Sequence, residues 1–565
     1  MNQEDILGKA AFVRLLKNAV DTCRADGRFS GKEIPRIVLE VPKHEGQGDF
    51  ATTLALSLAK IEKIPPRDIA AALVSVLENK TPWVQKIEIA GPGYINFFLT
   101  NDFWRRALLT IHDQQSNFGT WSAPVKEKVL IEFVSANPTG PLHVASGRAA
   151  ALGDALARLL EAGGHTVNRE YYLNDIGAQI NLLGRSTYAR YRALFGEATA
   201  LPEGGYQGDY IIEIAEALKK RDGDRYLHDP ETAHLSLFTQ YSLETISDWI
   251  RRDLHDFGID FDRWFSEKTL DDQNEVTTAL DFLKSQKMLY EQEGAQWVRT
   301  TPFGDDKDRV VVRGNGQKTY FASDIAYHRN KFERGYDRLI DIWGADHHGY
   351  VNRIKAATQA LGHKPESLTI LIHQLVNLLR DGTPVKMSKR AGTFVTLREV
   401  MDEVGVDATR FFFLMRRSDT TLDFDLELAK KATNENPVFY VQYAHARLCS
   451  ILRVAKAQGW DVEAVIQQAD LNTLRPLELP EELAIIRELS RYPELIQSAA
   501  DAMEPHRLTF YLQNLAGMLH RYYFSCRVLT EDEALTKARL VLIAAIRIVL
   551  QNGLRILGIS APEEM

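Results

Sequence analysis

One stretch of the sequence decides the fold: residues 128–162, which read KVLIEFVSANPTGPLHVASGRAAALGDALARLLEA. Residues 128–135 are a short run of β-branched and apolar side chains, which predicts a buried strand. A turn containing Pro138, Gly140 and Pro141 follows. Residues 147–162 predict a helix, because the leucines from Leu152 onward fall on one helical face.

This pattern continues into a strand–helix–strand unit. Gly163 and Gly164 are expected to end the helix, and residues 166–172 to form the next strand. A second unit is expected further along, as a strand, a turn, a helix and a strand at 338–343, 344–349, 350–361 and 368–378. Two such units predict an α/β fold with a Rossmann-like, doubly wound parallel sheet.

The chain of 565 residues is long enough for three or four domains. Residues 1–115 mix helical and strand patterns and predict an α+β domain. The doubly wound domain is expected at 120–424, with a polar, largely helical insertion at about 195–300. Residues 425–565 contain long amphipathic segments near 436–456, 480–503, 506–525 and 531–555, which predict an all-α domain.

Composition excludes several classes of protein. The start lacks the apolar stretch of a signal peptide, and no apolar segment approaches the ~20 residues of a membrane span. Three widely spaced cysteines without a CxxC pair support neither a zinc ribbon nor a disulfide framework. We therefore expect a cytoplasmic protein without membrane contact. The net charge of −8 argues mildly against a nucleic-acid partner, but a local basic surface can exist on an acidic protein.

The turn before the first long helix is a candidate phosphate site. A helix N-terminus presents unpaired N–H groups and a partial positive charge, which suits phosphate. His143 and Ser146 stand at this end, where both can donate hydrogen bonds. Taken alone, a strand–helix turn with one histidine is more often structural than functional.

A second candidate is the loop Lys386-Met387-Ser388-Lys389-Arg390. Three cations within five residues more often form a solvated surface than a site. Here they follow the second strand–helix–strand unit, so the loop can close over the carboxyl ends of the strands, where such folds bind ligands. Mobile cations closing on a triphosphate stabilise the negative charge that develops in a transition state.

The two candidates together resemble one family. NPTGPLHVAS at 137–146 resembles the class I aminoacyl-tRNA synthetase signature His-x-Gly-His in the form found in bacterial arginyl-tRNA synthetases, and the loop at 386–390 resembles its companion Lys-Met-Ser-Lys-Ser. The resemblance covers nearly the whole chain in order. It continues through GDFA, GPGYIN, EYYLND, GADHHGY, VDATR and NPVFYVQYAHAR, at 48–51, 91–96, 170–175, 344–350, 406–410 and 436–447.

The resemblance implies a reaction and its partners. Arginine is activated with ATP to arginyl-adenylate, and the arginyl group is then transferred to the 3′ end of tRNA for arginine. Magnesium is expected with ATP, held largely by phosphate oxygens. The N-terminal domain should hold the tRNA elbow and the helical C-terminal domain the anticodon. The family favours a monomer and generally needs bound tRNA before it activates arginine.

Site residues follow from the same resemblance. The residues expected to bind ATP are His143, Ser146, Gly147, Lys386, Met387, Ser388 and Lys389. Of these, His143, Ser146, Lys386 and Lys389 are the expected catalytic residues. The residues expected to bind arginine are Glu132, Asn137, His143, Tyr320, Asp324 and His347. Tyr320 and Asp324 match the pair that faces the guanidinium, a planar five-donor cation best held by a carboxylate.

The anticodon is expected to meet Tyr443 and Arg447, which share a helical face at a spacing of four residues. Aromatic and arginine side chains there can stack on unpaired bases. The alternative for Tyr443 is a core position.

The signature departs from the family at one point, because this chain has His143-Val144-Ala145-Ser146. Losing a donor such as the second histidine typically costs ~3 kcal/mol, or ~10²–10³ in rate, of which a serine hydroxyl can recover part. Two hypotheses follow: an active ligase, or a weakly active or non-catalytic relative that binds tRNA. A hydrolase built on Ser146 is excluded by the missing G-x-S-x-G. His347 and His348 lack further metal ligands at suitable spacing.

Overall fold

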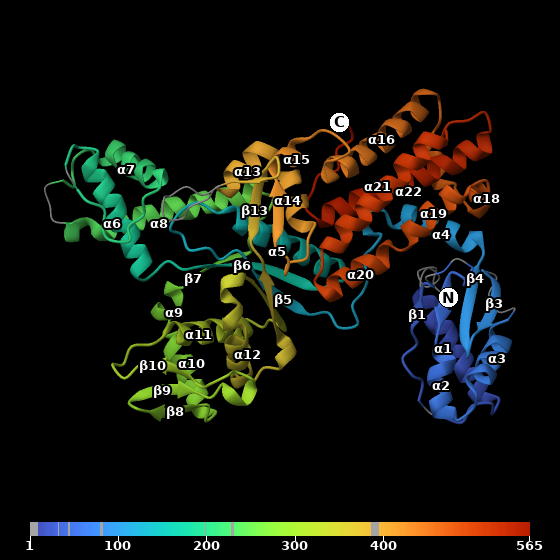
Figure 1. Cartoon of the computed structure of the whole chain (residues 1–565), viewed down its shortest axis with the longest axis horizontal. Helices are drawn as coiled ribbons and strands as arrows, with labels where there is room; N and C mark the ends of the chain where they lie inside the picture. The colour runs from blue at the N-terminus through green and yellow to red at the C-terminus, as the bar shows by residue number, and fades with distance from the viewer. Residues whose placement is uncertain are drawn as a thin grey trace.

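A computed structural model describes residues 9–31, 33–42, 44, 46–78, 83–197, 199–227, 231–385 and 395–565 of the chain. The N-terminal domain and a helical insertion lie at opposite ends of the molecule, and the main sheet lies between them (Figure 1). The C-terminal helices pack beside that sheet (Figure 1). The predicted fold class is confirmed: a doubly wound domain with an α+β domain before it and a helical domain after it.

The N-terminal domain is built on an antiparallel sheet with strand order β1-β2-β4-β3. Its core forms around Phe12, whose ring packs edge-on against Phe50, Trp83 and Phe97. Its strands are β1 (Leu39–Glu40), β2 (Phe50–Thr52), β3 (Val84–Ala90) and β4 (Tyr94–Leu99). Its helices are α1 (Lys9–Ala25), α2 (Leu54–Glu62), α3 (Pro66–Leu77) and α4 (Asn101–Gln114), followed by the short η2 (Gln115–Asn117).

The main sheet is parallel throughout, with strand order β12-β11-β5-β6-β7. Its strands are β5 (Lys128–Glu132), β6 (Thr166–Leu173), β7 (Arg263–Ser266), β11 (Arg338–Gly344) and β12 (Leu368–His373). Helix α5 (Val144–Ala162) connects β5 to β6, and α12 (Val351–Ala360) connects β11 to β12. The winding reverses between β5 and β11, so ligands are expected at the carboxyl ends of these two strands.

Two elements of the doubly wound domain differ from the prediction. Helix α5 begins at Val144, not near residue 147, so His143 is its N-cap. The strand expected at 368–378 is two strands, because β13 (Val376–Arg380) leaves the main sheet and pairs with β14 (Thr383–Pro384) and β15 (Leu422–Asp425). The apolar run continues through both strands, so periodicity alone did not indicate the break.

The expected insertion is interrupted. Helices α6 (Ala178–Ala193), α7 (Asp209–Asp222) and α8 (Glu231–Asp256) surround a small aromatic core, and α6 starts before residue 195. Strand β7 then returns to the edge of the main sheet. The elements that follow are α9 (Lys268–Asp272), α10 (Glu275–Ser285), β8 (Leu289–Gln292), β9 (Ala295–Val298), η3 (Thr301–Phe303), β10 (Arg309–Val312) and α11 (Tyr320–Glu333).

The rest of the chain is mainly helical. Its longest helix, α22 (Glu533–Ile556), is almost fully buried and packs against α16, α21 and α4. The segment expected at 480–503 is two helices that meet at Arg491. The other helices are α13 (Leu397–Val404), α14 (Val406–Leu414), α15 (Leu426–Lys430), α16 (Pro437–Ala457), α17 (Val462–Gln467), α18 (Leu471–Leu474), α19 (Pro480–Ser490), α20 (Tyr492–Ala502) and α21 (His506–Ser525). Within the described ranges, no helix has the length and apolar character of a membrane span.

Candidate active site

The backbone is strained where β5 ends. Val134 and Ser135 have φ values of 68° and 40°, in the left-handed region that β-branched residues rarely adopt. Ser135 Oγ donates a hydrogen bond to Glu132 Oε1 at 2.9 Å and accepts one from the Tyr172 N–H at 3.1 Å. These bonds hold the turn in its unusual conformation. Strain of this kind at the carboxyl edge of a sheet is typical of functional sites.

The start of α5 meets the chain that returns from the lysine-bearing loop. Leu397 N donates to Leu142 O at 2.8 Å, and Val144 N donates to Val395 O at 3.3 Å. His143 forms an antiparallel bridge with Thr396 between these two bonds. The first signature histidine therefore lies against the end of the loop region. The predicted ATP contacts of that loop lie outside the described residues: Lys386, Met387, Ser388 and Lys389.

Ser146 and Gly147 occupy the first turn of α5. Ser146 N donates to His143 O at 2.9 Å, so the serine lies at the helix end, where a phosphate donor is expected. Gly147 is buried, and a Cβ there would lie 2.5 Å from Leu397 Cδ1 and 2.9 Å from Phe413 Cε2. A side chain at this position would therefore have to displace Leu397 or Phe413 in the packing of α5 against α13 and α14. Contact of either residue with ATP stays a prediction.

Glu132 lies at the carboxyl end of β5 and is only 7% exposed. Lys331 Nζ lies 2.5 Å from its Oε2 atom. Asn137, in the turn that follows, is exposed and donates from Nδ2 to Gln179 Oε1 at 2.9 Å. Glu132 and Asn137 therefore lie at the same edge of the sheet, Glu132 buried and Asn137 exposed to solvent.

Helix α11 contributes Asp324, which accepts a hydrogen bond from Tyr350 Oη at 2.5 Å. Burial raises the pKa of this half-buried carboxyl. Tyr320, one turn earlier, is 77% exposed. His347, on the short helix η4 (Ala345–Tyr350) after β11, is also exposed, with Nε2 3.7 Å from Asp346 Oδ2.

Sequence reasoning missed one acid of this site, Glu267, which directly follows β7 and is buried. Burial raises its pKa to about 7, and the negative charges of Asp324 and Asp175 act in the same direction. Burial also raises the pKa of Tyr172, and the carboxylates of Glu267, Asp324 and Glu132 add to that shift. Tyr172 therefore stands among three carboxylates, in an acidic cluster suited to a cation.

Tyr443 and Arg447 lie on one face of α16, far along the chain from this acidic cluster. Arg447 Nη2 donates to Tyr443 Oη at 2.7 Å, and the guanidinium lies 4.5 Å from that ring centroid and 4.6 Å from that of Tyr523. Both residues are half-buried, so Tyr443 is not a core residue. They line an open cavity of about 940 Å³ beside Phe524, whose side chain is 95% exposed.

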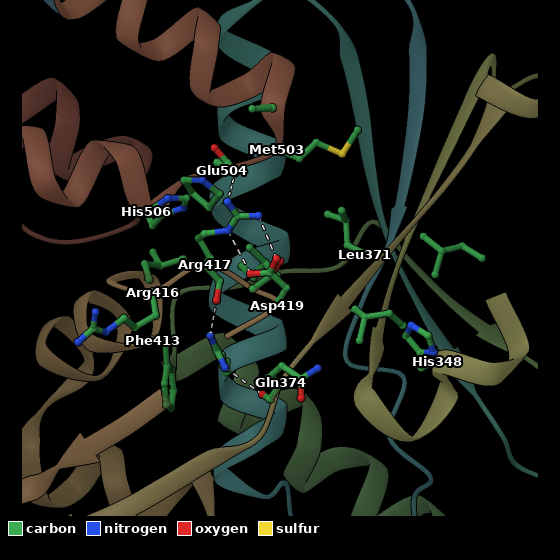
Figure 2. A pocket seen from close by; sticks show the side chains of 18 residues that line it. His348, Leu371, Gln374, Phe413, Arg416, Arg417, Asp419, Met503, Glu504 and His506 are labelled. Carbon is green, nitrogen blue, oxygen red and sulfur yellow. Dashed lines mark hydrogen bonds and ion pairs between the residues drawn. The ribbon is translucent and has the colours of Figure 1, made fainter. Parts of the chain in front are cut away.

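Figure 2 shows another cavity, of about 430 Å³, where α5 and β12 meet the turn between α20 and α21. Within it, Arg417 pairs with Glu504 at 3.6 Å. The buried Arg148 donates to the carbonyls of Gln374 and Leu375 and to those of Arg417 and Thr420. None of the predicted site residues lines this cavity, so we treat it as a junction between the doubly wound and helical domains.

Three family models together match almost the whole chain. The model described as tRNA synthetases class I (R), catalytic domain, matches residues 108–198 and 222–446. The model described as Arginyl tRNA synthetase N terminal domain matches residues 10–99, and the DALR anticodon binding domain matches residues 441–565.

Curated relatives and solved structures agree with these matches. The chain is 51% identical over 547 residues to an arginine–tRNA ligase of Citrifermentans bemidjiense, covering 97% of this chain and 98% of that one. It is 50% identical to an arginine–tRNA ligase of Desulfosudis oleivorans, with 99% and 100% coverage. The Thermus thermophilus arginyl-tRNA synthetase has a TM-score of 0.74 over 98% of this chain and 99% of its own, at 23% identity, which supports the fold alone.

Proposed function

Because the chain belongs to the arginyl-tRNA synthetase family, we propose that the acidic cluster at the carboxyl ends of β5, β7 and β11 binds arginine for activation. The chain is an ATP-dependent ligase that joins arginine to tRNA. The alternative of a non-catalytic tRNA-binding relative has no support from the comparisons. The observation that carries the proposed site is the group of three carboxylates near Tyr172: Glu132 ends β5, Glu267 follows β7 and Asp324 lies on α11.

Each end of arginine has a matching group in the acidic cluster. The guanidinium lies between Asp324 and Glu267. Burial raises the pKa of Glu267, and the negative charge of Asp324 adds to that shift until a cation arrives. A planar cation with five donors suits two carboxylate acceptors. The α-ammonium pairs with Glu132, and Asn137 and His347 lie near the substrate carboxylate. Tyr320 closes the guanidinium end from the surface.

ATP binds at the start of α5, where His143 and Ser146 meet its phosphates. The arginine carboxylate attacks the α-phosphate, which forms arginyl-adenylate and releases pyrophosphate. Magnesium accompanies ATP and is held mainly by phosphate oxygens. Lys386 and Lys389 neutralise the triphosphate from the loop that ends beside His143. Positioning and charge stabilisation supply most of the rate enhancement, since little covalent chemistry is asked of the protein.

The arginyl group then moves to the 3′-terminal adenosine of tRNA for arginine. Tyr443 and Arg447 stack on anticodon bases, which the nearby exposed ring of Phe524 supports. The N-terminal domain holds the tRNA elbow. The protein acts as a monomer in the cytoplasm.

Charging of tRNA with radiolabelled arginine tests this proposal. The purified protein should charge tRNA for arginine only when arginine, ATP and magnesium are all present. Asp324→Asn should raise KM for arginine without a matching change in KM for ATP. Arg313→Gln changes an exposed residue that directly follows β10 and serves as the control. Equal effects of Asp324→Asn on both KM values would remove Asp324 from the guanidinium site.

A further inference from the structure

Two buried carboxylates stand side by side beneath the proposed arginine site. Glu132 on β5 and Asp341 on β11 are direct partners in the parallel register, so their side chains leave the sheet on the same face. Both are buried. Two adjacent carboxylates away from water repel one another strongly unless a cation lies between them.

Lys331 supplies that cation. Its side chain is fully buried, and Nζ lies 2.8 Å from Asp341 Oδ1 and 2.5 Å from Glu132 Oε2. Burial opposes the ionisation of Asp341, but Lys331 and His328 outweigh it and hold the pKa of Asp341 at about 2. Burial raises the pKa of Glu132, against the attraction of Lys331. The ammonium therefore bridges the two carboxylates and contacts both Asp341 and Glu132.

The face of α11 that carries Lys331 also carries Asp324, the acid proposed for the guanidinium. Asp324, His328 and Lys331 follow one another at spacings of four and three residues on α11. His328 Nε2 lies 2.9 Å from Asp341 Oδ2, and its Nδ1 lies 2.8 Å from the Asp324 carbonyl oxygen. Through this chain of contacts, the acid proposed for the guanidinium and the acid proposed for the α-ammonium share one buried framework.

We propose that Lys331 is a positioning residue of the amino-acid site: anchored by Asp341, it fixes Glu132 in the orientation that receives the α-ammonium of arginine. The proposal rests on the arginine site proposed above. An ionised carboxylate offers about four acceptor positions, so Lys331 on Oε2 and Ser135 on Oε1 leave two for the substrate. Lys331 does not touch arginine in this arrangement, and it acts through Glu132.

A ligand without the α-amino group separates positioning from a merely structural role. 5-Guanidinopentanoate has the guanidinium and carboxylate of arginine but no ammonium, so it makes no ion pair with Glu132. The experiment compares KM for arginine with the inhibition constant of 5-guanidinopentanoate in tRNA charging. The variants are Lys331→Met combined with Asp341→Asn, which removes both charges of that ion pair and leaves Glu132 without its cation, and Asp341→Asn alone, which keeps Lys331 and nearly the same volume.

The double variant should raise KM for arginine by roughly tenfold or more, and the inhibition constant of the analogue by less than about threefold, because only arginine uses the ammonium contact. Asp341→Asn should also raise the ratio of KM for arginine to the inhibition constant of the analogue, by a smaller factor. Lys128→Met serves as the matched control, since Lys128 lies at the opposite end of β5 and its Nζ donates to the Arg334 carbonyl. It should leave both constants unchanged.

Glu132→Gln tests the proposed place of the α-ammonium separately from the proposed role of Lys331. If Glu132→Gln keeps the preference for arginine over the analogue, the proposed place of the α-ammonium is wrong. If Glu132→Gln loses that preference while the double variant and Asp341→Asn retain it, the role of Lys331 is overturned. A parallel rise of both constants in the Lys331 variant would also overturn it, because it would show a structural role only. Should the double variant not fold, Asp341→Asn alone decides by the same ratio.

Discussion

His143 and Thr396 face each other in an antiparallel bridge, which joins the start of α5 to the chain leaving the lysine-bearing loop. Leu397, the next residue, packs its Cδ1 atom where a Cβ on Gly147 would stand. The first signature histidine and the end of the loop region are thus held by one set of contacts. Changes in this packing should slow the activation of arginine with ATP and should also lower the stability of the protein.

Gly147→Ala should therefore destabilise the protein, although alanine is the better helix former by about 1 kcal/mol. The added methyl group meets Leu397 and Phe413, and overpacking of this kind costs about 1–3 kcal/mol. Thermal unfolding would measure the loss, and Leu397→Ala in the same chain should recover part of it. Gly314→Ala is the control, because the nearest atom to its Cβ is 3.6 Å away. Equal stability of Gly147→Ala and wild type would contradict the packing argument.

The raised pKa of Glu267 predicts a pH dependence in the free protein. Its folded pKa of about 7 lies above the ordinary value of 4.5, so the folded state binds more protons between these values. The contribution of Glu267 to the free energy of unfolding is therefore largest below about pH 4.5. It is lost as the pH rises through about 7, by on the order of 3 kcal/mol in total. Glu267→Gln should remove this part of the dependence. Urea unfolding of both proteins from pH 5 to 8 measures the difference, and identical pH profiles would refute it.

Arginine binding should depend on pH in the opposite direction and become tighter as the pH rises toward 7. In the proposed site the guanidinium pairs with ionised Glu267, so binding should release a proton when the pH lies below about 7. The dissociation constant for arginine should rise up to about tenfold for each pH unit below 7. Calorimetry in two buffers of different ionisation enthalpy would measure the proton released. Binding without proton release at pH 6 would place the guanidinium elsewhere.

Glu267 and Lys331 also show where sequence reasoning ends. The doubly wound fold follows from local periodicity and turn chemistry in residues 128–172 and 338–378. Helix α5 follows from the same pattern, although it starts at Val144 and not near residue 147. Glu267 was missed because β7 is only four residues long and lies within a helical insertion, so no periodic pattern marked it as a strand. Lys331 was missed because its partners lie 199 and 10 positions away, on strands whose register only the folded sheet defines.

Replacing Arg148, which lines the cavity shown in Figure 2, should strongly lower the stability of the protein. Its buried guanidinium satisfies four backbone carbonyls from two separate turns, and burial lowers its pKa to about 10. Arg148→Met would leave these acceptors unpaired, at about 1–3 kcal/mol for each one that stays buried. Urea unfolding should show a loss of several kcal/mol. Arg416→Ala, from the same cavity wall, should change little; a similar loss in both variants would point to the cavity rather than to the carbonyl contacts.

The anticodon proposal predicts a selective loss of tRNA binding. Tyr443→Ala removes a ring that stacks with Arg447, and losing one base stack costs about 1–3 kcal/mol. KM for tRNA should rise by roughly tenfold or more, while KM for arginine at saturating tRNA stays unchanged. Tyr443→Phe keeps the ring and loses only the bond to Arg447, so it should behave nearly as wild type. If Tyr443→Phe is as damaging as Tyr443→Ala, the hydroxyl contact and not stacking carries the binding.

Ser146→His restores the second histidine of the family signature and tests how much the departure matters. Ser146 sits in the first turn of α5, where unpaired N–H groups and the helix dipole already favour phosphate. In an active ligase these groups, His143 and the loop lysines supply the stabilisation that the histidine gives elsewhere. We therefore expect Ser146→His to change the rate of arginine activation by less than about tenfold, against the ~10²–10³ that one missing donor typically costs. Pyrophosphate exchange with tRNA present measures it, and Ser146→Ala shows what the hydroxyl contributes. A rise of a hundredfold or more would mean that the serine limits the reaction and that the remaining groups do not replace the histidine.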